Sequence, residues 1–237
     1  KNYKNFIFHK NDISNFKLMH NIFKKYKPKI IVNLAAQAGV RFSIKNRDPY
    51  FKSNVKGFYN ILELCKEFNV KKLIFASTSS VYGDSTKFPL KETFSTDAPK
   101  SFYAATKKCN EIMAYAYSKL CDTDFIGLRF FTVYGPYGRP DMALYKFVKS
   151  IKKNKPIDVY NNGNHFRDFT YIDDVIDGVF NSIKLKKLKN NYEIINLCRG
   201  KVKELYHFLN LIEKYTQKKF KKKFLPLQEG DVKKTFG

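Results

Sequence analysis

The stretch KLIFAST, residues 72–78, is a short apolar run that ends in two hydroxyl residues. Three other runs have the same character: KIIVNLAA at 29–36, FIGLRFF at 125–131 and YEIINLC at 192–198. Near-continuous runs of β-branched and aromatic residues are typical of parallel strands that are covered on both faces. FIFHKND, residues 6–12, is a candidate for a further strand. The runs therefore predict a parallel sheet with a buried centre.

Segments with apolar residues at helical spacing separate these runs, at 48–69, 101–120, 141–154 and 173–187. Pro49 suits the start of the first helix, and Asp173 and Asp174 are expected to cap the last one. Strands that alternate with helices predict an α/β fold with a doubly wound sheet. After residue 133, Gly, Pro and Asn become frequent, which predicts a smaller lobe.

Composition narrows the function classes. The 237 residues are 43% hydrophobic and 16% aromatic, as in a globular protein. The net charge of +24 suggests anionic partners. However, the lysines are spread over every segment, so we expect no nucleic-acid binding, while small anionic substrates stay compatible. The four cysteines form no CxxC pair, and no apolar run has the roughly 20 residues needed to span a bilayer. We expect a cytoplasmic protein with no metal site and no membrane partner.

SFYAATKK, residues 101–108, places Tyr103 four residues before Lys107 on one helix face. A fixed ammonium favours the phenolate and lowers the pKa of a nearby tyrosine, so the pair is a candidate acid/base. An ordinary amphipathic helix gives the same spacing. The context favours chemistry, because Thr78, Ser79 and Ser80 follow a buried strand, where open α/β sheets place their ligands. A hydroxyl-rich turn at a strand end is the plainer alternative.

Five segments together carry a family resemblance: LAAQAGVR (34–41), ASTSSVYG (76–83), YAATK (103–107), LRFFTVYGPYGRPDMA (128–143) and RDFTYIDDV (167–175). With them the sequence resembles the extended short-chain dehydrogenase/reductases. Within that family it is most similar to nucleotide-sugar 4-epimerases that act on UDP-glucuronate. The resemblance implies a Rossmann-type sheet that binds NAD, formed by residues 1–133 and 171–198. It also implies a substrate-binding lobe formed by 134–170 and 199–237.

The resemblance also implies roles for individual residues. Tyr103 is the expected catalytic base, Lys107 its partner that also holds the nicotinamide ribose, and Thr78 the hydroxyl at the sugar O4. The other expected cofactor contacts are Asp12, Ile13, Ala35, Ala36, Gln37, Asn54 and Phe130. The expected substrate contacts are Ser79, Ser80, Thr132, Arg139, Arg167 and Asp231. Arginine suits phosphate and carboxylate because its planar fork stays charged, although Arg167 could instead pair with Asp168 or Asp173.

The implied reaction is the NAD-dependent conversion of UDP-glucuronate to UDP-galacturonate through a 4-keto sugar, in a homodimer formed by the helices at 48–69 and 101–120. UDP-glucose 4-epimerisation, dehydration and decarboxylation are the alternatives. Ser79 and Ser80 stand where dehydratases carry Asp-Glu, which argues against dehydration. A sugar-nucleotide-binding structural or regulatory protein is the non-enzymatic alternative. The sequence contains no GxGxxG or GxxGxxG motif. We therefore expect a fragment that lacks the N-terminal βαβ unit, is truncated at its C-terminus and is inactive alone.

Overall fold

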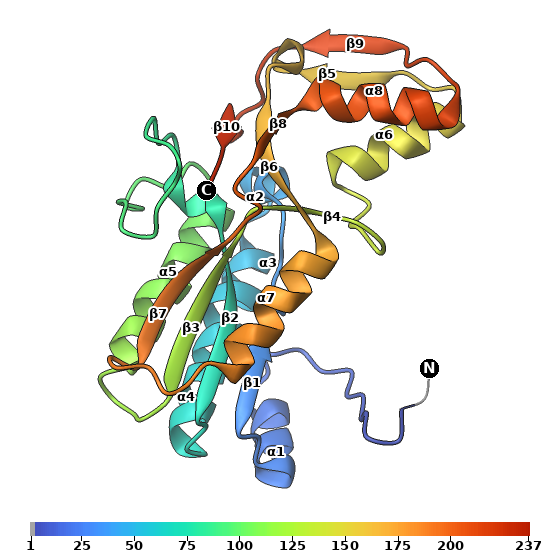
Figure 1. Ribbon diagram of the computed structural model, residues 1–237. Helices are drawn as coiled ribbons and strands as arrows, with labels where there is room; N and C mark the ends of the chain where they lie inside the picture. The colour runs from blue at the N-terminus through green and yellow to red at the C-terminus, as the bar shows by residue number, and fades with distance from the viewer. Residues whose placement is uncertain (1–2) are drawn as a thin grey trace.

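A four-stranded parallel sheet is at the centre of the larger lobe in the computed structural model, which describes residues 3–237. Residues 1 and 2 of the expected NAD-binding domain lie outside the described residues. The strands are β1 (Ile30–Asn33), β2 (Lys72–Thr78), β3 (Asp124–Phe130) and β7 (Tyr192–Leu197), in the order β1-β2-β3-β7. The four runs predicted as strands are thus strands, and the predicted doubly wound parallel sheet is confirmed (Figure 1).

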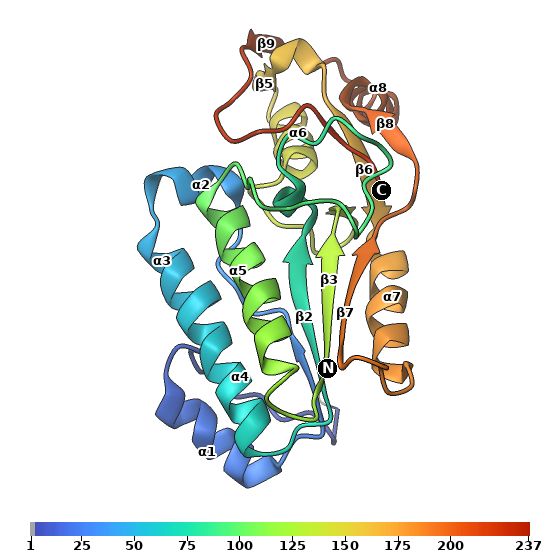
Figure 2. The same ribbon diagram turned by 90° about the vertical axis from the view of Figure 1, so that its left-hand side faces the viewer.

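Helices cover both faces of this sheet. Figure 2 shows α4 (Gly57–Glu67) and α5 (Phe102–Tyr117) on one side and α7 (Ile172–Lys184) on the other. Successive residues of β2 point to opposite faces. Accordingly, Leu73 and Phe75 join the core under α4 and α5, while Ile74 joins the core under α7. The helix α1 (Phe16–Tyr26) packs against α4.

The helix predicted at 48–69 contains three consecutive segments. They are α3 (Asp48–Tyr50), the π-helical turn η1 (Phe51–Lys56) and α4. A π-turn adds a residue to a helical turn and often occurs at functional sites. Here the turn η1 carries Asn54, whose side chain is buried at the candidate site.

Apart from β7, the strands after residue 131 form further sheets. β4 (Thr132–Tyr134) and β10 (Lys234–Thr235) flank β6 (Phe166–Tyr171), which also pairs with β8 (Val202–Glu204). β5 (Ile157–Tyr160) pairs with β9 (Lys222–Leu225), and α6 (Ala143–Lys152) and α8 (Leu205–Thr216) pack against each other. Phe147, Ile151, Val159 and Leu209 belong to a separate core there.

Two expectations about local structure were wrong. Residues 6–12 form no strand, and Phe6, Ile7 and Phe8 are exposed, because no described segment offers them a ladder of hydrogen bonds. Tyr171, not an aspartate, is the N-cap of α7; Asp173 and Asp174 lie in its first turn. Their carboxylates still face the positive end of the helix dipole there. Within residues 3–237, no helix has the length and apolar character that crossing a membrane requires.

Candidate active site at the carboxyl edge of the sheet

The expected hydroxyl cluster lies at the carboxyl end of β2. Thr78 ends this strand and is in register with Phe130, which ends β3. Ser79 and Ser80 begin the short 3-10 helix η2 (Ser79–Tyr82), and the Thr78 side chain caps it by accepting a hydrogen bond from the Ser80 amide at 3.2 Å. The Thr78 hydroxyl donates to Ser80 Oγ, also at 3.2 Å. The turn therefore holds its hydroxyls at the edge where such sheets bind ligands.

Tyr103 lies in the first turn of α5, which begins after Ser101. The Ser101 hydroxyl accepts a hydrogen bond from the Ala104 amide at 3.1 Å, and this cap fixes where the helix starts. Burial raises the pKa of the Tyr103 phenol, while Thr78 and Arg139 lower it and Tyr50 raises it further. The net pKa is above the usual value, opposite to the direction expected from the sequence.

Lys107 explains this difference. Its ammonium is buried and donates a 2.8 Å hydrogen bond to the Ala76 carbonyl of β2. Burial lowers the pKa of Lys107 to about 8. The side chain thus ties α5 to β2, and the cation whose charge favours the Tyr103 phenolate is Arg139.

The amide side chain of Asn54 bonds to the loop after β1. Asn54 Oδ1 accepts from the Gln37 amide at 2.8 Å, and Asn54 Nδ2 donates to the Gln37 carbonyl and to Thr106 Oγ1, each at 3.0 Å. Thr106 adjoins Lys107 on α5, so Asn54 links this loop to the helix of Tyr103. The neighbours of Gln37 are small: Ala35, Ala36, Ala38 and Gly39. A loop of small residues at a strand end lets a flat cofactor approach the backbone closely, so the residues present fit NAD.

Asp12 and Ile13 contact η1 and α4, the helical segments that carry and follow Asn54. Asn60 donates to the Ile13 carbonyl at 2.9 Å, and a Cβ on Gly57 would lie 2.6 Å from Ile13 Cγ1. The Asp12 carboxylate accepts from the Ser14 amide and pairs with Lys52 at 3.2 Å. These contacts, led by the Ser14 hydrogen bond, lower the pKa of Asp12.

Arg139 follows β4, which begins at Thr132. Both Nε and Nη2 of Arg139 donate to the Asp141 carboxylate, at 3.0 and 2.5 Å. The pair lies against the loop after β1, because the Cβ position of Gly39 is 3.5 Å from Arg139 Nη2. Tyr50 contacts the same loop, because its hydroxyl donates to the Gly39 carbonyl. The Tyr50 ring also packs edge-on against the Tyr103 ring, with 6.1 Å between centroids.

Arg167 and Asp231 form a second group. The Arg167 guanidinium donates to the carbonyls of Val232 and Lys233, at 2.6 and 2.9 Å. It thus makes neither of the aspartate salt bridges weighed above. Asp231 pairs with Arg41 at 2.9 Å. Burial lowers the pKa of Arg167, and Asp231 opposes this.

Sequence reasoning missed several residues of the site. Tyr50 lies in none of the motif segments, and Thr106 lies in YAATK but was assigned no role; their contacts depend on the helical turn that contains Asn54. Arg129 could have been identified from the sequence, because a charged residue inside the apolar run at 125–131 needs a buried partner. Among the described residues, no cluster of His, Cys, Asp or Glu is arranged to hold a metal ion.

Comparisons with known proteins agree with this geometry. The model of the NAD dependent epimerase/dehydratase family matches residues 1–198. A protein of Methanocaldococcus jannaschii is 50% identical over all of this chain and 72% of its own length. The UDP-glucuronate 4-epimerase of Thermodesulfobacterium geofontis is 44% identical with the same coverage.

A solved structure extends the comparison to three dimensions. It is the UDP-glucuronic acid 4-epimerase of Bacillus cereus in complex with UDP-glucuronic acid and NAD. It is 34% identical, has a TM-score of 0.90, and covers 98% of this chain and 72% of its own. The resemblance inferred from the motifs is thereby confirmed: this chain belongs to the NAD dependent epimerase/dehydratase family.

Proposed function

We propose that this protein is an NAD-dependent epimerase that inverts C4 of a UDP-sugar, and that the sugar is glucuronate. One observation carries the proposal. The Tyr103 phenol and the Thr78 hydroxyl are hydrogen-bonding neighbours at the carboxyl end of β2, and Lys107 on the same helix bonds to the Ala76 carbonyl of that strand. The relatives named for UDP-glucuronate 4-epimerisation support the substrate.

Each residue of the site has a role in the proposed reaction. Thr78 holds the sugar O4, and Tyr103 takes the proton of the C4 hydroxyl and later returns it. Thr78 and Arg139 are the neighbours that lower the pKa of Tyr103 and so favour the base form. When bound, NAD supplies the acceptor and donor of hydride for C4. Lys107, Asn54 and Gln37 hold the nicotinamide half of the cofactor, and Phe130 borders it.

The other cofactor contacts are proposed from their placement: Asp12 and Ile13 toward the adenine end, and Ala35 and Ala36 along the loop. Arg167 and Asp231 would hold the diphosphate and ribose. Ser79, Ser80, Thr132 and Arg139 would surround the sugar, with the Arg139 fork on its C6 carboxylate. Because Asp141 occupies this fork in the structure, the substrate carboxylate has to take its place.

A turnover assay of the full-length protein tests the substrate. We expect UDP-galacturonate from UDP-glucuronate and much slower turnover of UDP-glucose. Equal turnover of the two sugars would refute the choice of glucuronate. Tyr103→Phe should abolish nearly all turnover while UDP still binds; full activity of this variant would remove Tyr103 from the mechanism. Dehydration remains disfavoured, since Ser79 and Ser80 offer no acid beside Thr78.

Three further features complete the proposal. We infer a homodimer that buries exposed apolar side chains of α4 and α5, namely Tyr59, Ile112 and Tyr115. Four free thiols suit a cytoplasmic location. Residues 1–133 and 171–198 would bind NAD, and 134–170 and 199–237 the UDP-sugar.

A further inference from the structure

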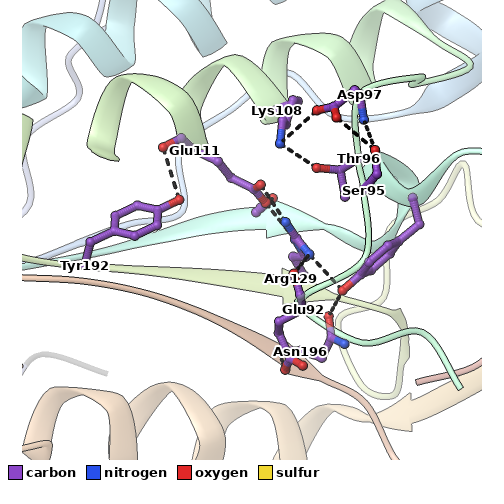
Figure 3. A network of polar contacts seen from close by, with 11 residues as sticks. Glu92, Ser95, Thr96, Asp97, Lys108, Glu111, Arg129, Tyr192 and Asn196 are labelled. Atoms are coloured by element: carbon purple, nitrogen blue, oxygen red, sulfur yellow. Dashed lines mark hydrogen bonds and ion pairs between the residues drawn. The ribbon is translucent and has the colours of Figure 1, made fainter. Parts of the chain in front are cut away.

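A buried network of polar side chains lies next to the proposed site. Two of its members, Ser77 and Arg129, directly precede the site residues Thr78 and Phe130 in their strands. At its centre, the Arg129 and Glu111 side chains are only 4% and 3% exposed and form a two-pronged ion pair (Figure 3). Arg129 Nε donates to Glu111 Oε1 and Nη2 to Oε2, each at 2.8 Å. Burial alone would lower the pKa of Arg129, but the Glu111 carboxylate raises it above its usual value. Arg129 is therefore charged at neutral pH.

One branch of the network leads to the helix of Tyr103. Glu111 lies eight residues after Tyr103 and four after Lys107, so all three share one face of α5. The Glu111 carboxylate also accepts a 2.6 Å hydrogen bond from the Ser77 hydroxyl. Ser77 directly precedes Thr78 and is in register with Arg129. Two contacts, Ser77 with Glu111 and Ala76 with Lys107, thus fix α5 against the last residues of β2.

The other branch leads to the turn that follows Thr78. Arg129 Nη1 donates to the Tyr82 hydroxyl at 2.8 Å, and the guanidinium also lies over the Tyr82 ring at 4.8 Å. The Tyr82 hydroxyl donates in turn to Asn196 Oδ1 on β7, at 2.8 Å. Tyr82 ends η2, the turn that Thr78 caps. Arg129 therefore holds the far end of this turn.

We infer that Arg129, acting through Glu111 and Tyr82, is a positioning residue that sets the Thr78 turn against the Tyr103 helix. The inference rests on the proposed epimerase function. None of these three side chains has to touch the substrate. They act because proton transfer requires the two hydroxyls and the sugar O4 to meet within hydrogen-bond distance. A displacement of about 1 Å at such a site can lower the rate on the order of a hundredfold.

Tyr82→Phe tests this role with a small perturbation, since it removes one hydroxyl and keeps the ring. In the full-length protein we expect kcat to fall roughly tenfold or more, with KM for UDP-glucuronate within about twofold. Tyr192→Phe is the matched control. It also removes a tyrosine hydroxyl bonded to Glu111, but this bond goes to the main-chain carbonyl at 3.2 Å. Its kcat should stay within about twofold of wild type.

A double-mutant cycle separates positioning from general loss of stability. If Tyr82 acts through Thr78, then Tyr82→Phe should lower kcat by less than about threefold in a Thr78→Ala background. Losses that multiply in the double variant, or an unchanged kcat in Tyr82→Phe, would overturn the inference. An equal loss in Tyr192→Phe would overturn it as well.

Amide hydrogen exchange gives a readout that needs no turnover. Residues 78–83 should exchange faster in Tyr82→Phe than in wild type and should be unchanged in Tyr192→Phe. Unchanged exchange in both variants would overturn the inference. A wild-type protein without epimerase activity would instead refute the proposed function, and the exchange data would still decide whether Tyr82 holds the turn.

Discussion

Replacing Lys107 by methionine should make the protein more stable while abolishing its activity. The ammonium is buried, and within residues 3–237 its hydrogen-bond partner is the Ala76 carbonyl. Methionine has a similar length, brings no charge and adapts to irregular space in a core. The variant therefore removes the cost of a buried charge that the proposed chemistry requires.

The magnitude follows from the pKa of Lys107, which burial lowers from 10.5 to about 8. At pH 7 this difference amounts to roughly 3 kcal/mol against the folded state. The lost hydrogen bond to Ala76, whose donor is charged, offsets about 2 kcal/mol of this, so the expected net gain is about 1 kcal/mol. Between pH 8 and 10.5 the native wild type binds fewer protons than its unfolded chain. Its stability therefore rises with pH in this window, and the advantage of the variant should be lost by about pH 10.

Urea unfolding of the NAD-free proteins at pH 7 and pH 10 measures this difference. Lys108→Met is the control on the same helix. Its ammonium bonds the Thr96 hydroxyl and lies 3.6 Å from Asp97, so the substitution should cost up to about 1 kcal/mol at pH 7. The reasoning would be refuted by a Lys107→Met variant that is less stable than wild type at pH 7, or by a gain that does not change with pH.

Three other substitutions test single contacts. Glu111→Gln leaves the Arg129 charge buried without its anion and should cost about 3–5 kcal/mol in urea unfolding; a loss below about 1 kcal/mol would contradict this. Gly57→Ala puts a Cβ 2.6 Å from Ile13 and should cost about 1–3 kcal/mol, a loss that Ile13→Ala should largely reverse. Asn54→Leu removes the bonds that hold the loop after β1, so calorimetry should find NAD binding weakened at least tenfold; unchanged affinity would exclude this role.

The sequence predicted the central sheet well because its signal is local. Each of the runs at 72–78 and 125–131 carries the apolar pattern of a strand buried on both faces, and the structure buries them so. The run at 6–12 has a similar pattern, but a strand also needs a partner, which a local pattern does not reveal. The π-turn around Asn54 was missed for the same reason, since it depends on the contacts of that side chain with the loop after β1 and with α5.

The candidate site was only partly predictable. Helical spacing placed Tyr103 and Lys107 on one face, and the strand end placed Thr78 near them. The direction of the Tyr103 pKa was wrong, because spacing does not show where a lysine side chain bonds. In the structure Lys107 turns to the Ala76 carbonyl, and burial dominates the phenol. The partners of Arg129 lie far away in sequence, so only the fold identifies them.

The most direct test of the proposed reaction follows the hydrogen at C4 of the sugar. The full-length protein is given UDP-glucuronate that carries deuterium at C4, in ordinary water, and the product is examined by NMR. Inversion through a 4-keto sugar with a tightly held hydride predicts UDP-galacturonate that keeps its deuterium at C4. Hydrogen from the solvent at C4, or the absence of UDP-galacturonate, would contradict the account.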